Sequence, residues 1–230
     1  MAGGRLAELT SAQLAVSPPR TLLVPLGSFE QHGGHLPLDT DTRVAVAVAN
    51  ALCERFDELV VAPALEYGAS GEHQGYAGTL SIGSGVLHDL IVELARSLGP
   101  EFAGLVLLSW HGGNLDAIRG AVSQLRTEGH RVLAIMPTTT FGDAHAGRTE
   151  TSMMLALDPA VVHLEEARPG DTRPLSELMP QLREGGLAAV TETGVLGDPT
   201  GANAEEGRRL LDQLTASVDD QLARWLAGIA

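Results

Sequence analysis

Residues 21–42, TLLVPLGSFEQHGGHLPLDTDT, join an apolar run to a segment crowded with histidine and carboxylate side chains. The apolar run ends at Gly27, and its length and flanks are typical of a buried strand. Residues 41–56, DTRVAVAVANALCERF, contain no Gly or Pro and predict a helix that begins at the acidic end of the segment. The segment itself is therefore predicted to be a polar loop that connects a strand to a helix.

The same alternation of strand and helix continues along the chain. It predicts an α/β fold, a single-domain three-layer α/β/α sandwich with a mostly parallel sheet that takes in residues 1–230. In such sheets ligands bind outside the carboxyl ends of the strands, where the polar loops are expected to meet. Further strands are predicted at 59–63, 102–110 and 130–137, and helices at 84–98, 115–129, 151–158, 175–182 and 201–228.

The composition excludes several classes of protein. Acidic residues outnumber basic ones by 29 to 15, and the net charge of -14 repels nucleic acids and anionic membranes. The only cysteine, Cys53, leaves no partner for a disulfide or a CxxC zinc site within the chain. The N-terminus lacks the apolar core of a signal peptide, and no apolar run approaches the roughly 18 residues of a membrane span. A cytoplasmic protein that binds neither nucleic acid nor membrane is expected.

Five side chains in these loops suit a metal site. Glu30 and His32 are two residues apart, so an extended backbone places both on one face. Asp41 follows a Gly-Gly and Pro turn, His111 follows a predicted strand, and Glu150 begins a predicted helix. Imidazole and carboxylate ligands favour Zn²⁺, Fe²⁺ or Mn²⁺ over a thiolate cluster or a calcium site. Five ligands indicate two divalent ions, with Asp41 as the candidate bridge.

Other polar residues in the loops have two interpretations each. His35 lies in the first loop but breaks the spacing of the ligand pair, which favours a structural role. Asp39 is typical of a turn or a helix cap. Asn114 is either a helix N-cap or a substrate-binding group. His73, in a long Gly-rich loop, is a candidate for substrate binding at the pocket mouth, in its own or a neighbouring subunit.

Five segments together resemble the creatininase family, in the same order and over about residues 21–207. The resemblance implies a two-metal amidohydrolase on an α/β/α sandwich that forms a homo-oligomer, commonly a hexamer. It also implies that Glu30, His32, Asp41 and His111 are metal ligands. Creatininase itself has a glutamate where this chain has Gly113, and in the HGGN form Glu150 can complete the second metal site, which makes creatinine a doubtful substrate. The segments are GSFEQHGGHLPLDTD, EHQGYAGTLSI, WHGGN, DAHAGRTETS and GVLGDPTGANAEEG.

Two further residues receive roles from the resemblance. His145 matches a family histidine beside the substrate, where it could stabilise an oxyanion or protonate the leaving amine. Arg148 stands where many relatives have an acidic residue, and its guanidinium could hold the carboxylate of a peptide C-terminus. An ordinary ion pair, to Glu150 for example, is an equal alternative for Arg148.

The GRTETS segment and the short chain are most similar to the branch of the family that acts in mycofactocin biosynthesis. That branch consists of peptidases that remove a C-terminal Val-Tyr dipeptide from a modified precursor peptide. The resemblance therefore predicts a peptide substrate. The alternatives are hydrolysis of a small cyclic amide or formamide, such as creatinine or a formylaminopyrimidine, and a non-catalytic oligomeric homologue.

Overall fold

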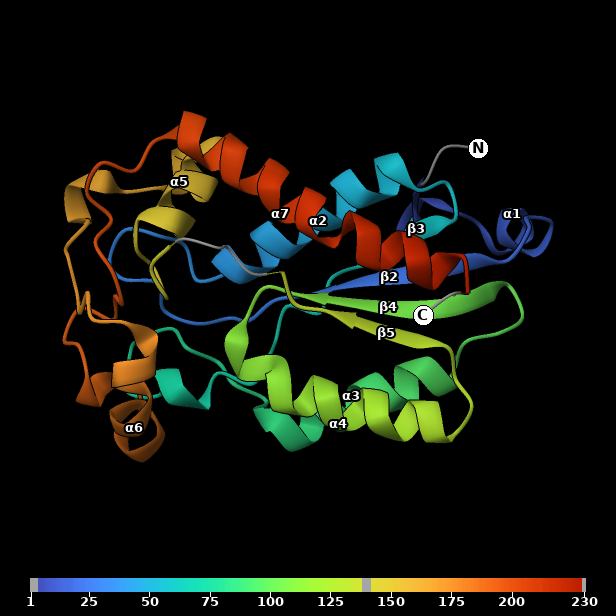
Figure 1. Ribbon diagram of the computed structural model, residues 1–230, viewed down its shortest axis with the longest axis horizontal. Coiled ribbons are helices and arrows are strands. Elements are labelled where there is room, and N and C mark those ends of the chain that lie inside the picture. The colour runs from blue at the N-terminus through green and yellow to red at the C-terminus, as the bar shows by residue number, and fades with distance from the viewer. Residues whose placement is uncertain (1–3, 138–141, 229–230) are drawn as a thin grey trace.

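The structure is a computed structural model that describes residues 4–137 and 142–228 (Figure 1). Its centre is a five-stranded sheet in which every neighbouring pair of strands is parallel. The strand order β1-β3-β2-β4-β5 puts β2 in the middle, with β3 and β4 on either side. The strands are β1 (Gly4–Arg5), β2 (Arg20–Leu26), β3 (Leu59–Val61), β4 (Phe102–Ser109) and β5 (Val132–Ile135).

Helices cover both faces of this sheet, as Figure 1 shows. On one face α2 (Thr40–Arg55) and α7 (Ala204–Leu226) share an apolar core with strands β2 to β5. On the other face α3 (Gly83–Arg96) and α4 (Leu115–Thr127) pack on alternate residues of the same strands. Strands buried on both faces need apolar side chains on both, which explains the unbroken apolar runs of β2 and β4. The predicted three-layer α/β/α sandwich is confirmed.

Helices α5 (Arg148–Leu157) and α6 (Leu175–Gly185) lie beyond the carboxyl end of the sheet, and α1 (Ser11–Ala15) lies at its other end (Figure 1). α5 packs against α7, and α6 lies near the 3-10 helix η2 (Gly71–His73). The short strand β1 and the short helix α1 were not predicted, because two and five residues carry too little periodicity. In the part of the chain that the structure describes, no helix is both long and apolar enough to cross a membrane.

The long closing helix is confirmed, but Asn203 and Glu206, whose spacing in the sequence resembles a capping box, do not form one. Asn203 caps α7, since its side-chain oxygen accepts a hydrogen bond from the backbone N–H of Glu206 at 2.9 Å. The Glu206 carboxylate does not complete the box by reaching back to the backbone of Asn203. It accepts hydrogen bonds from Arg148 at 2.8 Å and from Ser152 at 3.1 Å, and so joins α7 to α5.

The register of the two central strands fixes the position of the polar loops. Leu26 at the end of β2 pairs with Ser109 at the end of β4. The chain segments that leave these residues, 27–32 and 110–111, therefore start side by side at the carboxyl edge of the sheet. Ligand-binding residues of open α/β sheets are expected at this edge.

Candidate metal centre

Four segments bring the candidate ligands together at this edge. Glu30 and His32 come from the loop after β2, and His111 lies two residues beyond β4. Asp41 and Glu150 occupy the first turns of α2 and α5. The N-terminal end of a helix carries a partial positive charge, which favours a carboxylate in the first turn. All five side chains are buried.

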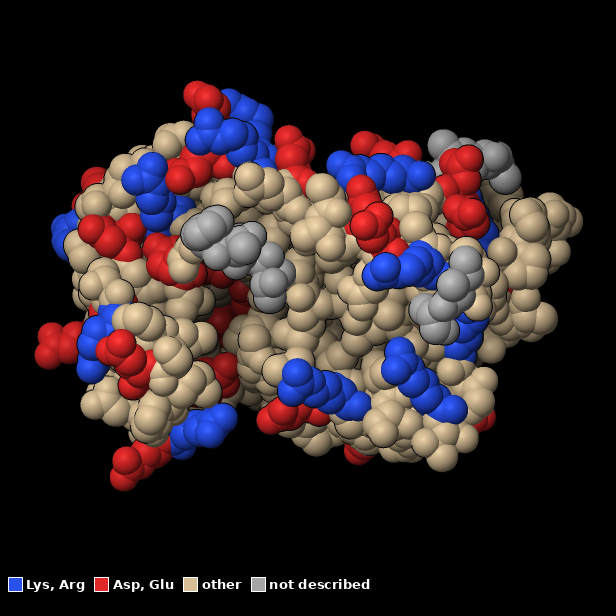
Figure 2. All heavy atoms as spheres, viewed as in Figure 1, with Lys and Arg blue, Asp and Glu red and all other residues tan. Residues whose placement is uncertain are grey.

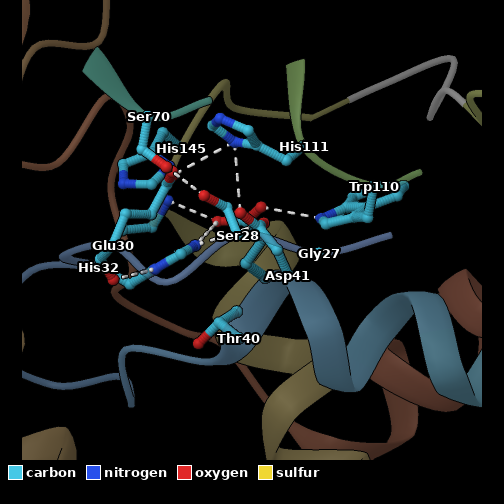
Figure 3. A network of polar contacts seen from close by, with 12 residues as sticks. Gly27, Ser28, Glu30, His32, Thr40, Asp41, Ser70, Trp110, His111 and His145 are labelled. Carbon is cyan, nitrogen blue, oxygen red and sulfur yellow. Dashed lines mark hydrogen bonds and ion pairs between the residues drawn. The ribbon is translucent and has the colours of Figure 1, made fainter. Parts of the chain in front are cut away.

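Asp41 lies at the centre of the group. Its Oδ1 is 3.4 Å from Nε2 of His32, and its Oδ2 is 3.2 Å from Nδ1 of His111. The same Nδ1 is 3.3 Å from Oε1 of Glu30, while Nε2 of His32 is 3.9 Å from Oε2 of Glu150. Figure 3 shows Glu30, His32, Asp41, His111 and His145 pointing toward one another. Asp41 therefore contacts both halves of the cluster.

Three overlapping sets of side chains have the spacing of a metal site. Glu30, Asp41 and His111 form one, and His32, Asp41 and Glu150 form a second; in each, the possible ligand atoms lie within 4.8 Å of one another. His145 joins Glu30 and His32 in a third set. Because Asp41 belongs to the first two sets, its carboxylate is placed to bridge two ions. Nitrogen and oxygen donors of this kind bind Zn²⁺, Mn²⁺ or Fe²⁺.

The hydrogen bonding of the cluster also fits a cation. Both carboxylate oxygens of Glu30 and Oδ2 of Asp41 are buried and make no hydrogen bond with any residue in the described ranges, although imidazole nitrogens face two of these oxygens at 3.1–3.3 Å. Buried carboxylate oxygens without hydrogen bonds are costly, so such groups in proteins are usually paired with charges or bound to metals. A divalent ion would satisfy these oxygens and the facing imidazole nitrogens at once.

The pKa values of the histidines also show that the buried carboxylates favour a positive charge beside them. Burial lowers the pKa of His32, but the negative charges of Asp41, Glu150 and Glu30 outweigh burial and raise this pKa to about 9. The pKa of His111 is raised well above its ordinary value, since Glu30 and Asp41 outweigh burial there too. Burial raises the pKa of Glu30, yet His111 overrides it and brings this pKa down to about 2. Without metal, protons on the imidazoles thus neutralise the carboxylates.

Glu150 is fixed by two donors. The indole N–H of Trp110 donates to Oε1 at 2.9 Å, and the backbone N–H of Ala146 donates to Oε2 at 2.7 Å. Ala146 is buried and has a φ of 51°, a left-handed conformation that costs a non-glycine residue about 1–3 kcal/mol. This strain aims the Ala146 N–H at the carboxylate. Burial raises the pKa of Glu150 to about 7 in the metal-free chain.

His145 and His73 lie against the cluster as neutral imidazoles. Burial lowers the pKa of His145 well below its ordinary value and that of His73 to about 4. Nε2 of His145 is 2.9 Å from the backbone oxygen of Gln31, so we assign this nitrogen as the protonated one. Its Nδ1 then faces Glu30 Oε1 at 3.8 Å as a free acceptor. Nε2 of His73 lies 3.1 Å from the same carboxylate oxygen, within one subunit.

Gln31 holds these two histidines in place. Its side-chain nitrogen donates to the backbone oxygen of Gly194 at 2.9 Å and to Nδ1 of His73 at 3.1 Å, while its backbone oxygen accepts from the Nε2–H of His145 at 2.9 Å. The buried Gln31 therefore contacts both rings, one with its side-chain amide and the other with its backbone oxygen.

The outer nitrogen of His111 meets a second acidic side chain. Nε2 of His111 donates to the backbone oxygen of Ala69 at 3.1 Å and is 3.5 Å from Oε1 of Glu72. A Cβ placed on Gly113 would lie 2.3 Å from Glu72 Oε1 and 2.5 Å from His111 Nε2. The Glu72 carboxylate thus fills the space beside His111 that a side chain at position 113 would need.

Two predicted substrate-binding residues are placed elsewhere. Asn114 is buried, and its amide links three backbone segments: it accepts from Ala69 N and donates to Gly27 O, both at 2.9 Å, and lies 3.2 Å from Ser109 Oγ. Its side chain therefore makes no capping hydrogen bond to α4, and its amide is engaged by these contacts. Arg148 is exposed and forms an ion pair with Glu206 at 2.8 Å, away from the cluster.

His35 and Asp39 lie outside the candidate ligand sets, and the Asp39 side chain, although at the N-cap position of α2, makes no capping hydrogen bond to this helix. Nε2 of His35 lies 2.9 Å from Oγ1 of Thr151, outside the three candidate ligand sets. Asp39 precedes α2 and accepts a hydrogen bond from Arg43 at 2.8 Å.

A pocket of about 510 Å³ opens onto the cluster. His73, His111 and His145 line one side of it. Figure 2 shows this face of the molecule hollowed between the α6 segment and the α3 and α4 helices, with acidic side chains inside the hollow. The volume lies within the range of about 300–1,000 Å³ that is usual for ligand sites.

Comparison with known proteins gives this centre a family. The family model for creatininase, creatinine amidohydrolase, matches residues 7–222. The chain belongs to the creatininase family. It is 48% identical to the mycofactocin precursor peptide peptidase of Mycobacterium ulcerans, over 98% of this chain and 93% of that protein. It is 49% identical to the protein of the same name from Mycobacterium tuberculosis H37Rv, with 97% and 92% covered.

Creatininases proper are more distant. The creatinine amidohydrolase of Pseudomonas putida is 28% identical over 87% of this chain and 88% of that protein. The solved structure of a mutant creatininase of Zn-Zn type is 27% identical, with a TM-score of 0.75 and 94% and 96% of the two chains covered. The structure of creatininase Mn has a TM-score of 0.74 at 27% identity, with 96% and 98% covered. The fold and the hydrolase class of the chain follow from these matches.

Proposed function

We propose that this creatininase-family protein is a metal-dependent peptidase that releases a C-terminal Val-Tyr dipeptide from the modified mycofactocin precursor peptide. The identity of 48–49% to mycofactocin precursor peptide peptidases, over nearly the whole of both chains, supports the peptide substrate. The observation that carries the chemistry is the Asp41 carboxylate, which is shared by two sets of possible ligands beside an open pocket.

The proposal places two divalent ions in these sets. Glu30, Asp41 and His111 would hold one, and His32, Asp41 and Glu150 the other. The names of the related creatininase structures, Zn-Zn type and Mn, support Zn²⁺ or Mn²⁺, and the donor set also accepts Fe²⁺. Two ions held about 3.5–4 Å apart would supply Lewis acidity that polarises an amide carbonyl and activates water.

His145 is our candidate for moving protons. Its Nε2–H is committed to the backbone oxygen of Gln31, and its Nδ1 faces the cluster without a proton. His145 Nδ1 can therefore accept a proton as water attacks the amide carbonyl and pass it to the leaving nitrogen. Glu150, fixed by Trp110 and Ala146, keeps its carboxylate in position while charge develops nearby.

The shape of the site favours a peptide over a small cyclic amide or a formamide. The pocket extends beyond the ligand cluster, where it is lined by Ala144 and by leucine and methionine side chains of α6. Gly113 replaces the glutamate that the sequence resemblance assigns to creatininase, and Glu72 fills the adjoining space from a different loop. The family resemblance also supports a cytoplasmic homo-oligomer such as a hexamer. Size-exclusion chromatography with light scattering tests that part separately.

The cleavage reaction itself can be tested by mass spectrometry. Metal-stripped protein is reconstituted with Zn²⁺, Mn²⁺ or Fe²⁺ and incubated with the modified precursor and with an unmodified peptide that ends in Val-Tyr. We expect release of the C-terminal dipeptide unit, abolished by chelator and by Glu150→Gln. Hydrolysis of creatinine or formamides, with both peptides intact, would overturn the proposal in favour of a small-amide hydrolase. Full metal occupancy without any hydrolysis would favour a non-catalytic homologue.

A further inference from the structure

The pocket beside the metal centre has two chemically different sides. One side consists of His73, His111 and His145. Apart from Glu72, Arg183 and two glycines, the rest of the lining is apolar, and α6 contributes several of these residues. The apolar residues that line the pocket are Leu115, Ala144, Leu175, Met179, Leu182, Leu187 and Leu196. A substrate that placed its amide bond near Asp41 would therefore place its neighbouring groups against α6.

A second hollow continues from the first. It measures about 720 Å³ and shares Glu72, Gly112, Gly113, Leu115, Met179 and Arg183 with the inner pocket. Its remaining lining is mostly polar and includes Ser81, Ser84, Asp116 and Arg119. Together the two form a groove that is apolar beside the metal centre and polar farther out.

We propose that the inner, α6-lined pocket receives the bulky apolar or aromatic side chain of the released C-terminal fragment, and that Met179 and Leu182 determine this preference. The proposal rests on the peptidase function proposed above. A short fragment of two residues can be accommodated next to the metals, whereas the rest of a long precursor must leave through the open, polar hollow. An aromatic ring fits the apolar side of the pocket, because its transfer from water onto leucine and methionine side chains is favourable.

Met179 is the position at which the pocket can be altered with least damage. It is half-buried, lines both hollows and lies on α6, which is outside the two main apolar cores of the sheet. A tryptophan at position 179 would narrow the inner pocket from its α6 side, and Met179 is not itself a candidate metal ligand. Leu182→Ala would instead enlarge the pocket. Leu90 on α3 is 37% exposed and lines neither hollow, so Leu90→Trp is the matched control.

The test compares kcat/KM for peptides that end in Val-Tyr, Val-Phe, Val-Ala and Val-Asp. We expect the wild-type protein to prefer Tyr and Phe over Ala by about tenfold or more, and Asp to be the poorest. Met179→Trp should remove the preference by slowing the aromatic peptides, with the Ala peptide changed by less than about threefold. Leu182→Ala should lower the aromatic preference partly, and Leu90→Trp should leave it unchanged. Equal rates for Tyr and Ala, or an unaltered preference in Met179→Trp, would overturn the proposal.

A binding measurement separates this proposal from the peptidase function. Isothermal titration calorimetry of the metal-loaded protein with the dipeptides Val-Tyr and Val-Ala measures the affinity of the pocket for each side chain, even if no peptide is hydrolysed. Tighter binding of Val-Tyr to the wild type, lost in Met179→Trp, is the expected result. Cleavage without side-chain preference would contradict the pocket alone, and preferential binding without cleavage would contradict the peptidase function alone. Equal affinities for the two dipeptides would contradict the pocket assignment in either case.

Discussion

Nδ1 of His111 lies 3.2 Å from Oδ2 of Asp41, although the histidine follows strand β4 and the aspartate begins helix α2. The other oxygen of Asp41, Oδ1, is 3.4 Å from Nε2 of His32. One carboxylate therefore contacts an imidazole from the loop after β2 and another from the segment after β4. The parallel pairing of β2 with β4 produces this contact, because it starts both loops at the same edge of the sheet.

Replacing Asp41 with Asn should empty both of the proposed metal sites. Asp41 belongs to both of the sets that we propose to hold an ion, whereas Glu30 and Glu150 each belong to one of these two. We expect Asp41→Asn to lose most bound metal and to reduce peptide hydrolysis by on the order of a thousandfold. Glu150→Gln should keep about half of the metal. Elemental analysis of the purified variants measures this, with Asp39→Asn as the control, since Asp39 pairs with Arg43 outside the cluster. Equal metal loss in Glu30→Gln, Glu150→Gln and Asp41→Asn would argue against a bridge.

Metal affinity should increase with pH. In the metal-free chain the pKa of His32 is raised to about 9, and that of His111 is raised well above its ordinary value. Both rings are therefore imidazolium cations, protonated on both nitrogens, at neutral pH. A metal ion must displace these protons, and the displacement becomes easier as the pH rises toward 9. Affinity should therefore increase by about tenfold per pH unit for each displaced proton.

Calorimetric titration with Zn²⁺ in buffers of different ionisation enthalpy counts the released protons directly. His88→Gln, far from the cluster on α3, should show the same pH dependence as the wild type. Binding without proton release between pH 6 and 8 would contradict the charge balance described for the centre.

Trp110 should matter for metal binding although it is not a ligand. Its indole N–H donates to Glu150 Oε1, and Trp110→Phe removes this donor while keeping a ring of similar shape. Loss of such a partner of a ligand typically weakens metal binding by about 10–100-fold. Competition with a chromophoric chelator measures the change. Trp225→Phe, on the buried face of α7, is the matched control, and the same affinity in both variants would refute the role of Trp110.

The two glycines of the HGGN segment should respond differently to alanine. A Cβ on Gly113 would meet Ala69, Glu72 and His111 at 2.3–2.5 Å, whereas a Cβ on Gly112 has nothing within 4 Å. Gly113→Ala should lower stability by about 1–3 kcal/mol and weaken metal binding, because His111 must shift. Thermal melts and metal content of the two variants test this. If Gly113→Ala behaved like Gly112→Ala, the close packing of Glu72 against His111 would be wrong.

The layers of the fold could be read from the sequence because its strands and helices are long and periodic. The closing helix and the strand at 102–110 each carry an unambiguous pattern. The candidate ligands could also be identified from the sequence, since each follows a predicted strand or lies at the start of a predicted helix. In the loop before Glu150, residues 138–141 lie outside the described residues.

The partners of the ligands could not be derived in the same way. Gln31 and Trp110 adjoin ligands in the quoted motifs, but their contacts with His73 and Glu150 depend on how distant loops fold together. Arg148 could pair with several acids, and the one it contacts, Glu206, belongs to a helix far along the chain. Asn114 has the residue type of a cap, yet tertiary contacts use its amide instead. Adjacency in sequence identified such residues as candidates without fixing their roles.

The most direct test of the account follows dipeptide release while metal-stripped protein is titrated with Zn²⁺, Mn²⁺ or Fe²⁺. Mass spectrometry measures the released dipeptide unit, and elemental analysis of the same samples measures metal per subunit. The account predicts no release without metal and a plateau near two equivalents, which Asp41→Asn does not reach at any metal concentration. Release by the metal-free protein, or undiminished release by Asp41→Asn, would contradict it.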